Sequence, residues 1–292
     1  MTIHHHPGRH ELGQNFLTDR RTIRTVVQLA AAGDGPLVEW AAGNGALTAE
    51  LAALNRPLEA VEIDSRRVAQ LRRRLPPHVC ITEGDILRHA PPVGQPCTIV
   101  CNIPFHITTP VLRRLLGMTG WTDAVLITQW EVARKRAGVG GATQLTAQWW
   151  PWFTFELRQR IPADAFSPRP SVDAGLLVVR RRIEPLVDRP RDYQSWVRTV
   201  FTGAGQGLPQ ILSRAGGLPL PVVRSWCRRQ GLSPRALPRD LSAEQWADAW
   251  RLTGDGTIRP AVGRKGGRPP VGSVGSSHDR RTPRARRRPQ QP

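Results

Sequence analysis

Short apolar segments alternate with longer segments of helical periodicity between residues 37 and 182. The apolar segments span residues 37–40, 58–64, 80–83, 98–102, 124–128, 153–160 and 175–180. Strands that alternate with helices form βαβ units, which build a parallel sheet covered by helices on both faces. The pattern therefore predicts an α/β fold with a doubly wound, Rossmann-like sheet of these segments. A helix is predicted over residues 65–75 and a loop over residues 138–141.

Helical patterns replace the strand pattern after residue 184. In the clearest of them, over residues 242–252, Ser242 and Gln245 form a capping box, and Leu241 and Trp246 stand at the positions of a hydrophobic staple. Trp246 and Trp250 are four residues apart and share one helix face. We therefore predict a small all-helical C-terminal domain over residues 184–254.

The chain is strongly basic, with 42 Lys and Arg residues against 23 Asp and Glu residues and a net charge of +19. Residues 255–292 carry +8 of this charge and contain no Leu, Phe or Trp, which predicts a disordered tail rich in Arg, Gly and Pro. The remaining body still carries +11. Such an excess is typical of proteins that bind a polyanion, either nucleic acid or an anionic membrane surface.

Several protein classes are excluded by simple patterns. No run of about 18 apolar residues occurs, so no membrane-spanning helix is predicted. The first ten residues are polar and lack the apolar core of a signal peptide. The four cysteines form no CxxC pair, so we predict neither a disulfide framework nor a metal site. We expect a cytoplasmic, monomeric protein without a membrane partner.

A glycine-rich turn, residues 39–45 (EWAAGNG), follows the first predicted strand. Glycines at such a turn permit close approach of the backbone to a ligand. Glu62 ends the second strand 23 residues after Glu39, where a carboxylate can accept hydrogen bonds from ribose hydroxyls. Asp85 follows the third strand and can accept a hydrogen bond from an adenine amine, with Ile86 covering the ring. Together these residues predict an adenosine-containing cofactor, either NAD or S-adenosylmethionine.

The turn Asn102-Ile103-Pro104-Phe105 follows the fourth predicted strand and favours the second cofactor. An aromatic amine is a poor nucleophile because its lone pair is delocalised into the ring. An Asn side-chain oxygen and a backbone carbonyl can accept both amine N–H groups, which favours the geometry in which the lone pair points at a methyl donor. Pro104 restricts the backbone, and Phe105 offers a face on which a flipped base can stack. A simple Asn-Pro turn is the alternative.

Two more segments complete the set of motifs: residues 13–17 (GQNFL) and residues 166–173 (FSPRPSVD). In this order the motifs resemble those of the rRNA adenine N6-methyltransferases, over residues 10–250. That superfamily includes the small-subunit dimethyladenosine transferases and the Erm macrolide-resistance enzymes. The actinobacterial Erm branch is the most similar in residues 10–17 (HELGQNFL), the Asn-Ile-Pro-Phe form, residues 201–203 (FTG) and the basic tail.

The resemblance implies S-adenosylmethionine as cofactor and 23S rRNA as partner. It implies N6-methylation, single or double, of one adenine, which confers resistance to macrolides, lincosamides and streptogramin B. It also implies a methyltransferase domain over residues 19–183, preceded by an arm, residues 1–18, that carries a cofactor-site motif.

The same resemblance implies roles for individual residues. Glu62 is expected at the ribose, Asp85 at the adenine and Asn102 near the reactive methyl group. The residues expected at the cofactor are Asn15, Leu17, Ala41, Gly43, Glu62, Asp85, Ile86 and Asn102. Those expected to be catalytic are Asn102, Ile103, Pro104, Phe105 and Phe166. Phe105 is expected to stack on the target base, with Phe166 on the other side of the base or near the path of the methyl group. Ala41 stands where the family usually has Gly, and a positive φ there would cost roughly 1 kcal/mol.

Other functions remain open at this point. A housekeeping 16S rRNA dimethyladenosine transferase would share all of these motifs. A non-catalytic rRNA-binding or assembly factor would retain the fold, although the complete 102–105 turn argues against it. An NAD-dependent oxidoreductase would need an acid or base for hydride transfer, which the motifs do not suggest. Arg113, Arg114, Arg134 and Arg136 are candidates for contacts with RNA phosphates.

Overall fold

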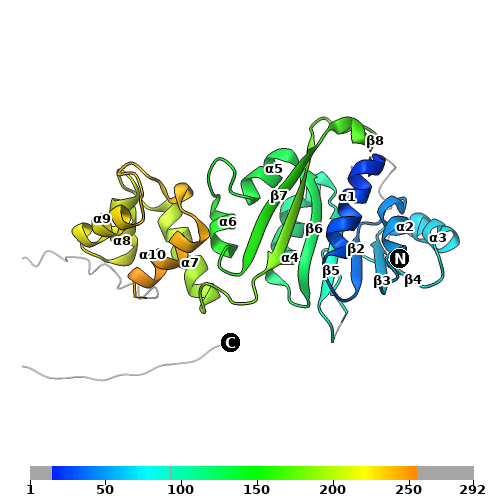
Figure 1. The fold of residues 1–292 in the computed structure, drawn as a ribbon, viewed down its shortest axis with the longest axis horizontal. Coiled ribbons are helices and arrows are strands. Elements are labelled where there is room, and N and C mark those ends of the chain that lie inside the picture. Colours follow the sequence, from blue (N-terminus) through cyan, green and yellow to red (C-terminus); the bar gives the residue numbers. More distant parts are fainter. Residues whose placement is uncertain (1–14, 93, 255–292) are drawn as a thin grey trace, which may run out of the picture. The chain divides into compact units, whose positions relative to one another are not determined.

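The computed structural model describes residues 15–92 and 94–254 (Figure 1). Its main sheet has seven strands in the order β4-β3-β2-β5-β6-β9-β7. Their bounds are β2 Leu37–Trp40, β3 Leu58–Glu62, β4 Val79–Glu83, β5 Cys97–Asn102, β6 Trp121–Gln129, β7 Phe153–Ile161 and β9 Ala174–Arg181. Each strand coincides with a predicted apolar segment, so the predicted strands are confirmed.

One strand departs from the predicted parallel sheet. The pairs among β4, β3, β2, β5 and β6 are parallel, whereas β9 pairs antiparallel with both β6 and β7. A parallel neighbour requires a crossover connection, usually through an α-helix. Residues 162–173 join β7 to β9 with only a 3₁₀ turn (Ala163–Ala165) and the two-residue strand β8 (Phe166–Ser167). The prediction of an all-parallel sheet was therefore wrong for β9.

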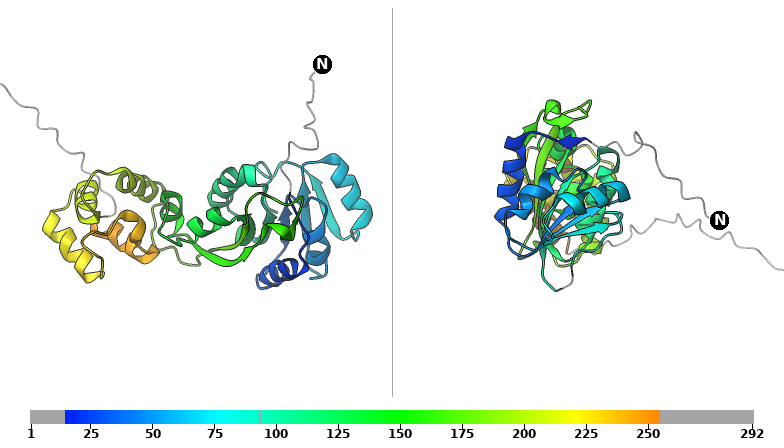
Figure 2. Two further views of the ribbon diagram at one scale, coloured as in Figure 1. Left: turned by 90° about the horizontal axis from the view of Figure 1, so that it is seen from above. Right: turned by 90° about the vertical axis from the view of Figure 1, so that its right-hand side faces the viewer.

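Alternate residues of the central strands enter two separate cores. Leu37 and Val100 belong to one core, while Val38 and Ile99 belong to the other. Helices α1 (Arg20–Ala31) and α2 (Ala46–Ala52) pack into the first core, and α4 (Thr108–Gly117) packs into the second. Figure 2 shows helices on both sides of the sheet. The doubly wound α/β fold is thereby confirmed.

Side-chain caps mark the helix ends that the sequence suggested. In α3 (Ser65–Arg74), the Asp64 carboxylate accepts the N–H of Arg66 at 2.9 Å, and the helix ends shortly before Pro76. In α10 (Ala243–Leu252), both hydrogen bonds of the Ser242–Gln245 capping box are present, at 2.9 and 3.2 Å. The helix predicted over residues 65–75 and the helix predicted over residues 242–252 are both confirmed.

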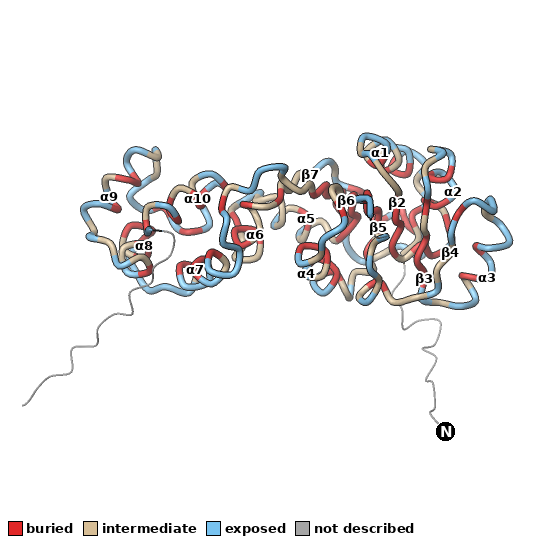
Figure 3. Tube along the Cα trace, turned by 90° about the horizontal axis from the view of Figure 1, so that it is seen from below, coloured by how far each residue is buried: buried red, intermediate tan, exposed pale blue. Residues whose placement is uncertain are grey.

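Helices follow the sheet through residue 252. They are α7 (Pro190–Thr202), α8 (Leu208–Gly216), α9 (Leu220–Arg229) and α10. Buried aromatic residues belong to their core, among them Tyr193, Trp196, Trp246 and Trp250. Figure 3 shows buried stretches of chain in these helices. Ala147 of α6 (Gln144–Trp149), which precedes β7, packs into the same core. The division into domains at residues 183 and 184 therefore stays a prediction.

A two-stranded pair that the sequence did not suggest holds the start of the described chain. β1 (Phe16–Leu17) pairs antiparallel with β8, with Leu17 opposite Phe166. The N–H and the hydroxyl of Thr18 both donate to the Ala165 carbonyl, at 2.8 and 3.0 Å. These bonds hold Asn15 near the carboxyl ends of the strands, where the predicted site lies.

Two predicted segments fall outside the described residues: most of the N-terminal arm, residues 1–14, and the basic tail, residues 255–292. Within residues 15–92 and 94–254, no helix is both long enough and apolar enough to cross a bilayer.

Candidate active site

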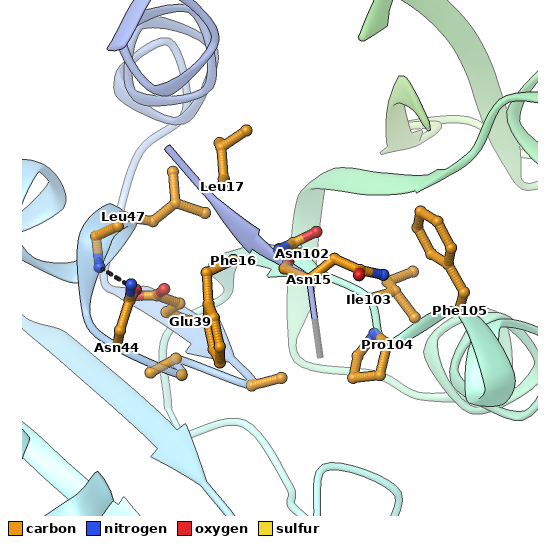
Figure 4. A pocket seen from close by; sticks show the side chains of 14 residues that line it. Asn15, Phe16, Leu17, Glu39, Asn44, Leu47, Asn102, Ile103, Pro104 and Phe105 are labelled. Atoms are coloured by element: carbon orange, nitrogen blue, oxygen red, sulfur yellow. Dashed lines mark hydrogen bonds between the residues drawn. The ribbon is translucent and has the colours of Figure 1, made fainter. Parts of the chain in front are cut away.

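A cavity lies at the carboxyl ends of β2 and β5, which are neighbours in the sheet (Figure 4). From β2 the chain continues through β3 and β4 toward one sheet edge, and from β5 it continues through β6 toward the other. Open α/β sheets bind ligands at such a switch point. The lining residues come from β1 and the residue before it, from β2 and β5 and the turns that follow them, and from the start of α2: Asn15, Phe16, Leu17, Glu39, Ala41, Ala42, Gly43, Asn44, Ala46, Leu47, Asn102, Ile103, Pro104 and Phe105.

The turn after β2 contains left-handed backbone at Ala41 (φ 58°), Gly43 (φ 59°) and Gly45 (φ 80°). A Cβ at Gly43 would lie 3.0 Å from Cε1 of Phe16, and one at Gly45 would lie 2.6 Å from Cδ2 of Leu71. Glycine therefore suits both positions for space as well as for conformation, because a side chain would press on its neighbour and favour another backbone conformation. Ala41 adopts the same conformation at a cost of about 1–2 kcal/mol.

Replacement of Ala41 by Gly is expected to stabilise the protein by about 0.5–1 kcal/mol. The stabilisation equals the strain energy that is removed at residue 41, minus the free-energy cost of the extra conformational entropy that Gly gives the unfolded chain. Urea unfolding of the two proteins measures the difference. Asn55→Gly is a matched control: Asn55 is also left-handed (φ 53°) but does not line the cavity. Asn tolerates this conformation better than Ala, so the control should gain less. A lower stability for Ala41→Gly would contradict the strain at Ala41.

Glu62 lies behind the glycine turn, with only 1% of its surface exposed. One carboxylate oxygen accepts the Gly43 N–H at 2.7 Å, and the other accepts the N–H groups of Ile63 and Asp64 at 2.9 and 3.0 Å. Glu62 thus fixes the turn through backbone bonds and does not itself line the cavity. A carboxylate has about four acceptor positions, so these bonds leave capacity for a ligand hydroxyl. Its role at a ribose stays a prediction.

Asn102 lies at the end of β5, where its Nδ2 donates to the backbone carbonyl of Asn15 at 2.8 Å. Because only the amide nitrogen can donate to a carbonyl, this bond determines which way the side-chain amide is oriented. Ile103 is 1% exposed, so its side chain belongs to the core and only its backbone is available to a ligand. Phe105 is half-buried at the first residue of a 3₁₀ turn (Phe105–Ile107).

Besides Glu62, three predicted site residues do not line the cavity. Asp85 is partly buried, and its carboxylate accepts the N–H of Leu87 at 2.8 Å. Ile86 is 6% exposed and packs in the core. Phe166 is 4% exposed and belongs to the core on the other face of the sheet, against which Phe105 packs. Ile63, next to Glu62, is 54% exposed, which makes it a better candidate than Ile86 for covering a ligand ring.

The prediction missed Glu39, which lines the cavity although it is 2% exposed. Burial raises the pKa of this carboxyl to about 8, and the negative charge of Glu62 adds to the effect. Its Oε2 has no hydrogen-bond partner among the described residues. An acidic residue inside an apolar strand is a signal in the sequence, because charged side chains are rarely buried without a function or a partner.

Phe16 was also missed, although it belongs to the GQNFL motif. Its ring lines the cavity beside the glycine turn, and the guanidinium of Arg67 on α3 lies 4.5 Å from the ring centroid. Arg67 in turn pairs with Asp64 at 3.6 Å. Phe16 is therefore held between α3 and the turn after β2. Nothing in the sequence shows that residues so far apart come together.

Comparison with known proteins agrees with this geometry. Residues 5–249 match the model of the ribosomal RNA adenine dimethylase family. The mycinamicin-resistance protein MyrB of Micromonospora griseorubida is 47% identical over 292 residues, covering 96% of this chain and 93% of that protein. An rRNA adenine N-6-methyltransferase of Corynebacterium diphtheriae is 47% identical, covering 78% and 91%.

Among solved structures, the crystal structure of the 23S rRNA methyltransferase ErmE matches with a TM-score of 0.76 and 33% identity. The match covers 82% of this chain and 100% of that one. The sheet order, the two turns at its switch point and these relatives lead to one conclusion. The chain belongs to the ribosomal RNA adenine dimethylase family, whose cofactor is S-adenosylmethionine.

Proposed function

We propose that this protein methylates N6 of one adenine in 23S rRNA and thereby confers resistance to macrolides, lincosamides and streptogramin B. The observation that carries the proposal is the Asn102–Phe105 turn beside the glycine turn at one cavity. Relatives that cover most of the chain support the substrate: one is named for mycinamicin resistance and another for 23S rRNA methylation.

The cavity fits S-adenosylmethionine in its polar groups and in its backbone. Glu39 offers a buried oxygen without a partner, which suits the ammonium group of an amino acid. The left-handed turn at residues 41–45 has no side chain at Gly43 and Gly45, so a ligand can approach the backbone. When bound, the cofactor supplies an electrophilic methyl group on its sulfonium. We assign the amino-acid end to Glu39 and the ribose to Glu62.

Asn102 and the backbone of its turn would orient the target amine. Since Nδ2 donates to Asn15, the oxygen Oδ1 is left to accept one N–H of the adenine amine. The Pro104 carbonyl already accepts the N–H of Ile107 at 3.0 Å, so the Ile103 carbonyl is the better acceptor for the second N–H. Held in this way, the nitrogen lone pair turns out of conjugation with the ring. Positioning of this kind, without a strong base, is enough for transfer from an activated donor.

Phe105 would stack on the flipped adenine from one side, since it lines the cavity and is only half-buried. Phe166 is buried against Leu17, so we assign it to support of Phe105 and the arm. This revises the predicted place of Phe166 at the base or near the path of the methyl group.

The basic body would hold the RNA through its phosphates. Arg113 is exposed on α4, the helix that follows the 102–105 turn. Burial, and to a smaller extent the charge of Arg113, lowers the pKa of Arg136. The other candidate arginines donate within the protein: Arg114 to the His89 carbonyl, Arg134 to Glu131 and Arg136 to Thr143. Arg113 is therefore the best placed of the four for a phosphate. We expect a monomer that acts on ribosomal RNA in the cytoplasm.

Expression in a macrolide-sensitive bacterium tests the proposed function directly. Cells that make the protein should grow in erythromycin, and mass spectrometry of their rRNA should find methylated adenine in 23S rRNA. Cells that carry the empty vector are the control. A modified adenine in 16S rRNA without resistance would support the housekeeping alternative, and unmodified rRNA together with cofactor binding would support a non-catalytic factor.

A further inference from the structure

A network of partly buried, hydrogen-bonded side chains, made by Trp40, His89, Glu59 and Thr82, takes no part in the site described above. The indole Nε1 of Trp40 donates to Nδ1 of His89 at 3.1 Å, and Nε2 of the same imidazole lies 3.1 Å from Oε1 of Glu59. The Thr82 hydroxyl donates to that carboxylate oxygen at 2.7 Å. The His89 and Glu59 side chains are 10% and 20% exposed, and Trp40 is fully buried.

The donor and acceptor roles in this network are determined by Trp40. An indole nitrogen can only donate, so Nδ1 of His89 must accept and its proton must be on Nε2. Nε2–H then donates to Glu59. The His89 ring is therefore held at both nitrogens, each with its own specific partner. A network of polar side chains whose hydrogen bonds are all satisfied rigidifies the segments that it joins.

The segments joined by His89 are the two halves of the proposed cofactor site. Trp40 is the last residue of β2 and directly precedes Ala41 of the glycine turn. On the other side, the His89 N–H donates to the Asp85 carbonyl at 2.9 Å and closes the turn that carries Asp85. Arg114 of α4 donates to the His89 carbonyl, so α4 also holds the end of this turn.

We propose that His89 is a positioning residue that sets the Asp85 turn in place relative to the glycine turn, and so controls affinity for the adenine end of the cofactor. The inference rests on the proposed assignment of Asp85 to the adenine. Asp85 itself does not line the cavity, and its carboxylate is bonded only within its own turn at Leu87. The turn is joined to the end of β3 by the Gly84 N–H, which donates to the Glu62 carbonyl at 2.9 Å, and His89 supplies its side-chain link to the end of β2 through Trp40. His89 is expected to touch neither cofactor nor RNA.

Calorimetric titration tests this inference with two ligands, S-adenosylmethionine and 5′-methylthioadenosine, which keeps the adenosine but lacks the amino acid. His89→Phe retains a ring of similar size and removes both hydrogen bonds. The Kd of both ligands should rise about 5- to 20-fold, by the same factor, because two hydrogen bonds are lost. At saturating cofactor, kcat and the KM for RNA should stay within about twofold of the wild type.

Two further variants separate positioning from general loss of structure. His89→Asn places an oxygen near the position of Nδ1, so it should restore the Trp40 bond and part of the affinity. Trp40→Phe removes the donor instead, and in a double-mutant cycle its effect on Kd should not add to that of His89→Phe. His78→Ala, at an exposed histidine before β4, is the matched control and should bind both ligands normally.

An unchanged Kd in His89→Phe would overturn the inference, as would a loss in kcat at saturating cofactor without a change in Kd. If His89→Phe does not fold, His89→Asn and Trp40→Phe decide the question by the same titrations. Failure of the proposed function looks different: the wild-type protein itself would then bind neither ligand or methylate no rRNA.

Discussion

Asn102→Ala is expected to lower the rate of methyl transfer by at least about 10²–10³-fold, the usual effect of removing one essential polar contact from a transition state. The variant loses the oxygen that would orient the adenine amine. Binding of S-adenosylmethionine should change little, because the arm that carries Asn15 is also held by the β1–β8 pair and by Thr18. Single-turnover methylation of 23S rRNA fragments and calorimetric titration measure the two quantities.

Asn102→Asp is the informative companion variant. It keeps an acceptor oxygen but replaces Nδ2 by a second oxygen, which would face the Asn15 carbonyl at the 2.8 Å contact. Repulsion should turn the side chain away, so this variant should also be strongly impaired. Near-normal methylation by Asn102→Ala would exclude the proposed role. High activity of Asn102→Asp would show that the bond to Asn15 does not orient the amide.

Glu39→Gln is expected to change how the stability of the protein depends on pH. Burial raises the pKa of Glu39 from 4.5 to about 8, so the folded protein binds this proton more tightly than the unfolded chain. The stabilisation is complete below pH 4.5 and is lost as the pH rises through about 8. The loss amounts to about 1.4 kcal/mol per pH unit, and Gln, which does not titrate, does not suffer it.

The unfolding free energy of both proteins should therefore be compared by urea titration at several values between pH 5 and pH 8. Relative to wild type, Glu39→Gln should gain up to about 4 kcal/mol over this interval. Only the change of the unfolding free energy with pH is compared. The unpaired amide of Gln lowers the stability of the variant by a further amount of about 1–3 kcal/mol at every pH. Glu50→Gln, at an exposed position on α2, is the control and should follow the wild-type profile. Parallel profiles for wild type and Glu39→Gln would show that Glu39 is ionised in the folded protein.

The strands could be predicted because their signal is local. An apolar run such as Leu37–Trp40 is bounded by turn residues within a few positions, and burial on both faces explains why three of its four residues are apolar, with Glu39 the exception. The direction of β9 could not be read in the same way. Its residues are as apolar as those of the parallel strands, and only the short connection from β7 makes it antiparallel.

The site was predicted in part for a similar reason. Ala41, Gly43 and the 102–105 turn were found because each turn is contiguous in sequence and follows a strand. Phe16 and Glu39 line the same cavity but were missed. The place of Phe16 depends on pairing with β8 and on Arg67, and the protonation of Glu39 depends on burial and on Glu62.

By itself, the sequence determined the α/β class and the two turns of the site, because periodicity and turn chemistry act over a few residues. The strain expected at Ala41 followed from the resemblance to a family that usually has Gly there. Only the tertiary structure decided the order of the strands, the orientation of the Asn102 amide and the link from Trp40 through His89 to Glu59. Each of these depends on groups distant in sequence, such as Asn15 and Asn102, which are 87 residues apart. Such contacts form only when the sheet brings strand ends together, so no local pattern records them.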